Sequence, residues 1–257
     1  MTERVLLDYA DRTERTASRG FTTNVFAGIG LDRYARAASE LGEVYVAWNA
    51  RGVSAVRTAA GDAAFEAWFG ERFERRAVRA LEEDDPTLDC ARQNLGGNQV
   101  DVPLDLSACS PFEAAVLKAT SYITRGNARS YGWLARELHA AQATRAVGKA
   151  LGRNPVPLLI PCHRVIRADN AVGGYVFGSD VKRRLLEAEG VDFEAVEGVA
   201  RRGFRYVACS DGTFCLPTCG DVARRIDMPG YLGLHSAHEA HARGLEPCST
   251  CRPVAAA

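Results

Sequence analysis

The pattern of hydrophobic and polar positions predicts a polar lead followed by a mixture of helix and strand. Residues 1–20 are rich in charged and polar side chains and are expected to be poorly ordered. Residues 21–41 permit a helix. The segments 43–49 and 53–59 alternate and are rich in β-branched and aromatic residues, so they predict two strands joined by a turn at 49–52.

The following stretch completes a small first domain. Aromatic side chains recur at near-helical spacing in residues 62–76 and predict a helix whose aromatic side faces a core. The acidic run 82–85 is followed by Pro86 and predicts a loop. Residues 21–107 are therefore expected to form an α/β domain, in which we recognise no chemistry.

Helical patterns dominate the middle of the chain. Ser110 suits an N-cap and Pro111 a first helical position, so a helix is expected to start there. The segments 130–140 and 143–152 predict two short helices with a tight connection. This spacing suits a helix-turn-helix, whose second helix enters a DNA groove, although helical pairs are common in other proteins. A further helix is expected at 181–190.

The distribution of charge bears on the partner. The 257 residues include 32 Lys and Arg and 32 Asp and Glu, and this zero net charge alone argues against nucleic acid. However, residues 1–110 carry a net −5 and residues 111–190 a net +6, with nine basic residues and one acidic residue between Lys118 and Arg167. A local basic region attracts phosphates even when the whole protein is neutral, whereas a solvated basic surface is the alternative interpretation.

The lengths of the apolar segments and the number of cysteines indicate the cellular compartment in which the protein is expected. No apolar run approaches the roughly 18 residues of a membrane helix, and the first twenty residues are too charged for a signal peptide. We therefore expect a cytoplasmic protein without a membrane partner. Under reducing conditions, its eight cysteines favour thiols, metal sites or catalysis over a disulfide framework.

Cys162 is the first candidate for a reactive thiol. It lies in NPVPLLIPCHRVI at 154–166, where proline turns and an apolar strand lead into Cys-His-Arg. A thiol is a nucleophile only as thiolate, so it needs a base or positive neighbours. His163 is adjacent, but neighbouring side chains of a strand point oppositely, so a bend or a bridging water is required. Glu189 can orient that imidazole and complete a relay, while a buried structural cysteine is the alternative.

Five blocks around this cysteine resemble a known family. In order they are YGWLA, RAVGKALGRNPVP, IPCHRVI, GGY and KRRLLEAEG, and they resemble the O6-alkylguanine-DNA alkyltransferases, also called methylated-DNA–protein-cysteine methyltransferases. The resemblance is close over about residues 108–190 and loose over the domain before. It implies a mostly α-helical, helix-turn-helix (winged-helix-like) domain at 108–192 that binds double-stranded DNA. That domain transfers an alkyl group from guanine O6, with thymine O4 as a second candidate, irreversibly to its own cysteine. The implied protein is a monomer that acts once per molecule and needs no cofactor for this transfer.

The resemblance also implies roles for single residues. Cys162 accepts the alkyl group, His163 and Glu189 activate it through water, and Asn154 fixes the turn of the active site. Tyr131 helps to rotate the nucleotide and protonates the departing guanine. Four residues are expected to contact DNA: Arg145, as a finger that fills the gap in the base stack, Tyr175, beside the substrate loop, Lys149 and Arg164.

Two departures from the family pattern concern the substrate range. Val176–Gly178 replaces the Ser or Gly residues of many relatives, and TRGNARSY at 124–131 replaces the more usual Pro-x-Gly turn. A branch of alkyltransferase-like proteins lacks the cysteine and only binds lesions. Cys162 argues against membership of that branch.

A second group of cysteines near the end of the chain has the spacing of a metal site. C-x3-C and C-x2-C are separated by 28 residues and supply Cys215, Cys219, Cys248 and Cys251. These four match a structural four-thiolate zinc site, with unrelated core thiols as the alternative. Two further sets of residues are expected to have no chemical role. The first is His235, His238 and His241, because four thiolates already complete a tetrahedral site. The second is Cys90, Cys109 and Cys209, because they lack paired spacing.

The runs FRYVACSDGTFCLPTC and SAHEAHARGLEPCSTCRP resemble the metal-binding module of the Ada-type adaptive-response proteins. The resemblance covers about residues 203–253 and implies a small α+β zinc domain at 203–254, after a linker at 193–202. It also implies that Cys215 is both a Zn²⁺ ligand and the acceptor of a methyl group from a DNA methylphosphotriester. Methylation would remove one negative charge there and favour DNA binding, which is a sensor hypothesis. The alternative function is a lesion-sensing or regulatory DNA-binding protein that uses the zinc domain only as a tether.

Overall fold

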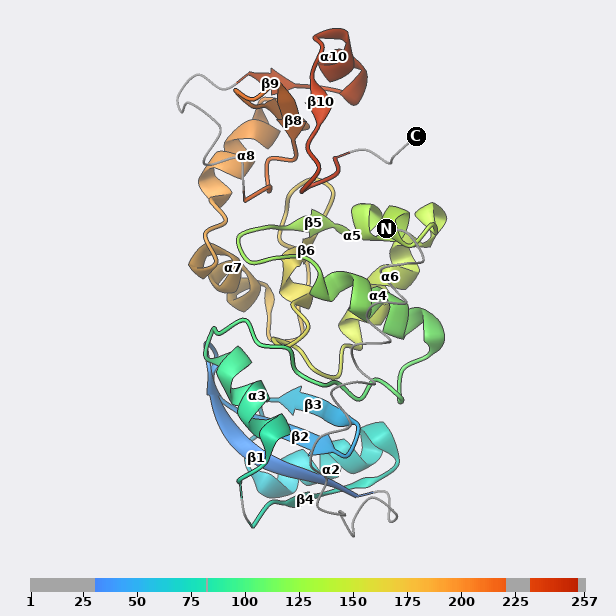
Figure 1. The fold of residues 1–257 in the computed structure, drawn as a ribbon, viewed down its shortest axis with the longest axis vertical. Helices are drawn as coiled ribbons and strands as arrows, with labels where there is room; N and C mark the ends of the chain where they lie inside the picture. Colours follow the sequence, from blue (N-terminus) through green and yellow to red (C-terminus); the bar gives the residue numbers. More distant parts are fainter. Residues whose placement is uncertain (1–30, 82, 221–231, 254–257) are drawn as a thin grey trace. The chain divides into compact units, whose positions relative to one another are not determined.

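The computed structural model of the protein describes residues 31–81, 83–220 and 232–253 (Figure 1). The chain divides into two compact units, residues 1–110 with 155–159 and residues 111–154 with 160–257. The lead at 1–20 and the first ten residues of the helix predicted at 21–41 lie outside the described residues. Within the described part of the chain, no helix is long and apolar enough to cross a membrane.

The first unit is built on a four-stranded sheet with the strand order β3-β2-β1-β4. β1, β2 and β3 form an antiparallel meander, and β4 pairs with β1 in parallel. The strands are β1 (Leu31–Ser39), β2 (Gly42–Asn49), β3 (Gly52–Arg57) and β4 (Arg76–Arg79), and the helices are α2 (Asp62–Phe73) and α3 (Pro86–Leu95). The two strands predicted at 43–49 and 53–59 are confirmed.

The aromatic side of α2 covers this sheet. Phe65 and Phe69 are fully buried against Tyr34 and Tyr45, and the rings of Phe65 and Tyr45 stack with their centroids 4.8 Å apart. The helix predicted at 62–76 is thus confirmed together with its core-facing side.

The predicted helix at 21–41 is wrong over residues 31–39, which form β1. Two neighbouring strands, β2 and β4, supply backbone partners to this segment, and such pairing overrides a weak local preference for helix. β4 and α3 are elements that the sequence pattern did not indicate. Asp85, at the end of the predicted acidic loop, caps α3 by accepting a hydrogen bond from the backbone N–H of Thr87.

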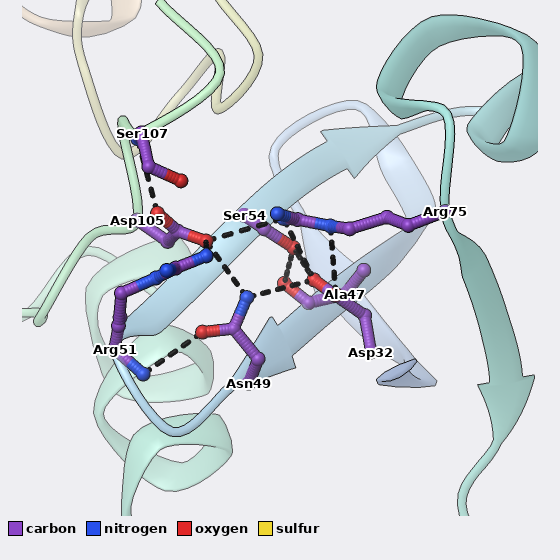
Figure 2. Close-up of polar contacts among 8 residues, drawn as sticks. All are labelled: Asp32, Ala47, Asn49, Arg51, Ser54, Arg75, Asp105 and Ser107. Atoms are coloured by element: carbon purple, nitrogen blue, oxygen red, sulfur yellow. Dashed lines mark hydrogen bonds and ion pairs between the residues drawn. The ribbon is translucent and has the colours of Figure 1, made fainter. Parts of the chain in front are cut away.

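A buried polar cluster holds the ends of this sheet to the segment that follows α3 (Figure 2). The Asp105 carboxylate accepts hydrogen bonds from Asn49 (2.8 Å), Arg51 (3.2 Å) and Arg75 (3.2 Å). Asp32 pairs with the same Arg75 at 2.9 Å. Because both carboxylates are almost fully buried, these contacts compensate charges that would otherwise be costly in the interior.

The second unit begins with the predicted helices. Ser130 caps α5 by accepting from the backbone N–H of Trp133, and the predicted helix start at Pro111 is confirmed. The elements are α4 (Pro111–Ser121), β5 (Arg129–Ser130), α5 (Tyr131–Glu137), a 3₁₀ turn (Ala141–Ala143), α6 (Thr144–Gly152), β6 (Val165–Ile166), α7 (Ser179–Ala188) and α8 (Phe193–Arg201). β5 and β6 form a short parallel pair. The winged-helix likeness stays a prediction.

Two local predictions in this unit are wrong. The predicted linker at 193–202 contains the helix α8, because Asp192 caps its first turn and Phe193, Val196 and Val199 share a buried side. The apolar strand predicted before Cys162 is absent from the described residues around it, and Cys162–Arg164 form a 3₁₀ turn.

The C-terminal module, residues 203–253, contains a second four-stranded sheet with the order β10-β8-β7-β9. Phe214, Leu234 and Ala240 form its small core. Its elements are β7 (Tyr206–Ala208), β8 (Thr213–Cys215), β9 (Gly233–Leu234), α10 (Ala237–Ala242) and β10 (Glu246–Pro247). This arrangement agrees with the predicted α+β class.

The polar cluster of the first unit gives a test of its stability. Asp105→Ala removes one of the two carboxylates that Asn49 and Arg75 share and leaves Asp32 as the other, so we expect a loss of about 1–3 kcal/mol in the free energy of unfolding. Asp101→Ala, at an exposed carboxylate nearby in sequence, is the matched control and should change stability by less than about 0.5 kcal/mol. Urea unfolding of both variants measures the difference, and equal losses would contradict a supporting role for the cluster.

Candidate active site and metal centre

The Cys162 sulphur is buried at the first position of the 3₁₀ turn, with the residue 6% exposed. The turn is closed by the N–H of Arg164, which donates to the Pro161 carbonyl at 2.9 Å. Asn154 donates from its side-chain amide to the Cys162 Sγ at 3.2 Å and to the Ile160 carbonyl at 3.0 Å. One amide group therefore holds both the loop and the sulphur. The turn also supplies the bend that the Cys-His pair was expected to need.

Burial opposes ionisation of this thiol. It raises the pKa of Cys162, while the Asn154 amide and the positive charge of Lys182 act in the opposite direction. The Lys182 ammonium is itself buried and donates to the carbonyls of Val165 (2.5 Å) and Gly174 (3.2 Å). Burial lowers the pKa of Lys182 to about 8.

Sequence reasoning missed Lys182. A usable signal was present, because Lys182 lies three and four residues before Leu185 and Leu186 on α7. That spacing places the lysine on the buried side of the helix.

His163 is held by a carboxylate from the end of α7. Its Nε2 lies 3.0 Å from Glu189 Oε1, and Arg164 donates to both oxygens of Glu189 at 2.7 and 2.8 Å. Burial alone would raise the pKa of Glu189, but the hydrogen bonds from His163 and Arg164 outweigh it and lower the pKa to about 2. His163 Nδ1 is buried and has no hydrogen-bond partner among the described residues.

Arg164 is placed differently from the expectation that it contacts DNA. Besides the two bonds to Glu189, it donates to the Ile123 carbonyl at 2.6 Å, and its side chain is only 16% exposed. Its guanidinium is therefore engaged in orienting Glu189, and a contact of Arg164 with DNA stays a prediction.

Two tyrosines lie near the sulphur. Tyr131 starts α5, its ring centre is 5.7 Å from Lys182 Nζ, and burial and the nearby Cys162 raise its pKa. The Tyr175 ring centre is 6.1 Å from that of His163, and its buried hydroxyl has no hydrogen-bond partner among the described residues. Burial raises the pKa of Tyr175 as well. Both phenols therefore stay protonated at neutral pH and can donate a hydrogen bond.

The exposed side of α6 is basic. Arg145 and Lys149 are exposed and stand four residues apart, while Val147, Ala150 and Leu151 face the core. The second helix of the predicted helix-turn-helix thus presents two cations on one side.

The four predicted metal ligands meet at one point, which we call the thiol tetrad. The sulphurs of Cys215, Cys219, Cys248 and Cys251 lie within 4.8 Å of one another, and all four residues are buried. The backbone N–H of Leu216 donates to the Cys251 sulphur at 3.3 Å. Contact with neighbouring thiols, first of all Cys209, raises the pKa of Cys215, and a bound cation would relieve this crowding by deprotonating the thiols. The donor set therefore fits a soft or borderline metal ion such as Zn²⁺.

The other candidates near the tetrad separate into two kinds. His235, His238 and His241 are exposed and do not belong to the tetrad, as expected. Cys209 differs from the expectation, because its buried sulphur lies 3.5 Å from that of Cys215.

A buried arginine in β5 and a tryptophan in α5 join these two elements to the tetrad region. Arg129, in β5, donates to the carbonyls of Thr218 and Thr250, both at 3.4 Å, and Trp133 Nε1 donates to the Cys251 carbonyl at 2.9 Å. Burial lowers the pKa of Arg129, while Cys251, Cys219 and Cys248 act in the opposite direction. The guanidinium is thus a source of positive charge close to the tetrad. Sequence reasoning did not single out Arg129.

Comparison with known proteins places this geometry in context. The family described as 6-O-methylguanine DNA methyltransferase, DNA binding domain, matches residues 111–191. A methylated-DNA–protein-cysteine methyltransferase of Methanothermobacter thermautotrophicus is 37% identical over 155 residues, which cover 59% of this chain and 82% of that protein. The protein of the same name from Mycobacterium tuberculosis is 46% identical over 91 residues, 35% of this chain and 54% of that protein. The chain therefore spans about half the length of this second relative. A crystal structure of a variant of the M. tuberculosis O6-methylguanine methyltransferase is similar with a TM-score of 0.51 and 31% identity, over 62% of this chain and 92% of that one.

The Glu189 ion pair predicts a pH-dependent contribution to stability. Its pKa in the folded protein, about 2, lies below the ordinary value of 4.5, so the contribution is complete above about pH 4.5 and is lost as the pH falls toward 2. We expect Glu189→Gln to lower the free energy of unfolding by about 3 kcal/mol at pH 7, and the difference from the unmodified protein to shrink below pH 4.

Urea unfolding at a series of pH values measures this difference. Glu187→Gln removes an exposed carboxylate of the same helix and should have little effect at any pH. A loss for Glu189→Gln that does not change with pH would contradict the assignment.

Proposed function

Since this chain belongs to the methylated-DNA–protein-cysteine methyltransferase family, we propose that it repairs DNA by moving the alkyl group of O6-alkylguanine to its own Cys162. One observation carries the proposal: the buried Cys162 sulphur is held by Asn154 in the turn that also contains His163, and His163 is in turn held by Glu189. This is the order of nucleophile, base and orienting carboxylate that nucleophilic catalysis requires.

The first task of the site is to form a thiolate inside the protein. The Asn154 amide and the Lys182 ammonium lower the cost of negative charge on Cys162. His163 Nδ1, buried and without a protein partner among the described residues, is suited to take up the thiol proton through a water molecule. The Glu189 carboxylate accepts a hydrogen bond from His163 Nε2 and stabilises the resulting imidazolium, and Arg164 fixes the carboxylate.

The transfer itself is a single displacement. The Cys162 sulphur attacks the alkyl carbon, a C–S bond forms as the C–O bond to guanine breaks, and the electron pair leaves with the guanine. Tyr131 gives a proton to that guanine, since its raised pKa keeps the phenol protonated until the purine becomes basic. The proton released from Cys162 restores the phenol through solvent, so no proton is gained or lost overall. The thioether is stable to the acids and bases of this site, and each chain therefore acts once.

The guanine O6 of a duplex is hidden, so the nucleotide must leave the base stack before it can reach a buried sulphur. We assign docking to the exposed basic side of α6, with Arg145 filling the vacated space and Lys149 contacting phosphate. Tyr175 lies beside His163 and offers an aromatic surface to the extruded base. Thymine O4 carries its alkyl group in a similar position and is a second candidate substrate.

For the C-terminal module we propose a zinc site formed by the thiol tetrad, with Cys215 as acceptor of a methyl group from a DNA methylphosphotriester. Zinc, when bound, keeps the thiols deprotonated while leaving their sulphurs nucleophilic. Arg129 offsets part of the negative charge, and Trp133 and Thr218 hold the module against β5 and α5 through backbone carbonyls. The competing proposal is a module that only tethers the chain to DNA, and it is supported by the same contacts.

Peptide mass mapping tests both parts. After incubation with a duplex that contains O6-methylguanine, we expect one added methyl group on the peptide with Cys162, and none in Cys162→Ala, which should still bind the duplex in a gel-shift assay. With a methylphosphotriester duplex we expect the methyl group on Cys215. Cys90→Ala, far from both centres in sequence, is the control and should behave like the unmodified protein. Methyl on Cys162 alone would favour the tether, and methyl on neither cysteine would contradict the enzyme proposal.

The role of Arg145 predicts a difference between substrates. Arg145→Ala should slow repair of a duplex by at least tenfold, because nothing replaces the extruded base, but should slow repair of a single strand much less. Arg136→Ala, at an exposed arginine of α5, controls for the loss of one positive charge. Single-turnover rates on the two substrates measure the effect, and equal slowing on both would count against the finger role.

A further inference from the structure

A fifth cysteine stands beside the thiol tetrad. The Cys209 sulphur lies 3.5 Å from the Cys215 sulphur, and the two residues belong to one buried cluster with Cys219, Cys248 and Cys251. Cys209 is not part of the tetrad, so it adds a thiol that a four-coordinate site does not need.

The backbone, rather than a flexible side chain, sets this position. β7 and β8 form an antiparallel hairpin in which Val207 pairs with Cys215, and the N–H of Cys209 donates to the Thr213 carbonyl at 2.7 Å. Residues two apart on a strand share a face, so Cys209 and Cys215 are diagonal neighbours on the same side of the hairpin. Gly212, at a φ of +79°, closes the turn by donating to the Cys209 carbonyl.

The spacing between the two sulphurs resembles that between two ligands of one ion. With metal–sulphur bonds of about 2.3 Å, the sulphurs of a tetrahedral four-thiolate site lie about 3.8 Å apart. Cys209 therefore lies about one such spacing from Cys215, and its sulphur would have to move by about that distance to take the coordination position of Cys215.

We propose that Cys209 is a replacement ligand, whose sulphur takes the coordination position of Cys215 when Cys215 is alkylated or removed. The proposal rests on the proposed metal site, and its consequence for repair rests on methyl acceptance by Cys215. Alkylation turns the Cys215 thiolate into a neutral thioether, which is a much weaker donor. With a cation bound, the Cys209 thiol would give its proton to solvent and its thiolate would take the place of the weakened Cys215 donor, so that one metal–sulphur bond would be lost and one formed.

The exchange of Cys215 for Cys209 would restore four thiolate ligands, and this changes the charge difference on which the sensor hypothesis depends. Without it, methylation of Cys215 removes one negative charge from the module. With it, Cys219, Cys248, Cys251 and Cys209 carry the same total charge as the original tetrad. The module would then keep its fold after repair without the charge change that was expected to strengthen DNA binding.

Cobalt substitution tests the exchange without any methyl transfer. In the full chain loaded with Co²⁺, the charge-transfer absorption counts thiolate ligands and the visible bands report tetrahedral geometry. We expect the intensity of four thiolates in the unmodified protein, in Cys209→Ser and in Cys215→Ala. We expect about three quarters of that intensity in Cys209→Ser combined with Cys215→Ala. Cys90→Ala combined with Cys215→Ala is the matched control and should keep all four.

Three results would overturn the proposal, and they differ in meaning. A three-thiolate spectrum for Cys215→Ala alone, equal to that of the double variant, shows that Cys209 does not replace Cys215. A three-thiolate spectrum for Cys209→Ser alone shows that Cys209 is already a ligand. Failure of the unmodified protein to give a tetrahedral thiolate spectrum removes the metal site itself, and with it the zinc part of the proposed function. Cys215→Ser provides a second variant in case Cys215→Ala fails to fold, and its expected spectrum is the same.

Discussion

A buried sulphur that must carry a negative charge is the constraint on which the rest of the catalytic unit depends. Burial shields the Cys162 sulphur from water, but it also raises the pKa of the thiol. Three groups around the sulphur oppose this increase in pKa. They are Asn154, which follows α6, Lys182 from α7, and His163 from the same 3₁₀ turn. Lys182 is itself buried and is held by two backbone carbonyls, so its ammonium group is fixed in place near the sulphur.

The thiol tetrad meets the same constraint in another way. There, four sulphurs share one small volume, and a divalent cation together with the buried Arg129 would offset most of the negative charge of four thiolates. Arg129 lies opposite Val165 in the β5–β6 pair, and Val165 follows Cys162 by three residues. The short strand pair therefore links the turn of Cys162 to the C-terminal module, because Arg129 donates to the Thr218 carbonyl and the Thr218 hydroxyl donates to the Ala128 carbonyl.

Structure could be predicted well from the sequence where the residue types and their spacing along the chain both point to the same element or site. The four cysteines of the tetrad could be grouped from their spacing, and the helices α5 and α6 could be predicted from their periodicity. Prediction failed where distant partners decide. β1 pairs not only with its neighbour β2 but also with β4, which follows β2, β3 and α2 in the chain. The partners of Arg164, which are Glu189 and Ile123, are also distant in sequence, so its buried contacts could not be read from the local pattern. Lys182 and Cys209 were missed because a buried lysine looks like an ordinary surface charge in sequence, and a single cysteine has no paired spacing until a hairpin supplies it.

The central claim is that one buried thiol accepts the alkyl group and keeps it. The most direct measurement is the number of methyl groups removed per protein chain when a duplex containing O6-methylguanine is supplied in large excess and the reaction is followed to completion. We expect the number of methyl groups removed per chain to reach a plateau at one, with no further loss of methyl from the DNA at longer times. Removal of several equivalents per chain would contradict it by showing that the thioether is turned over, and no removal at all would contradict the assignment of Cys162 as the acceptor.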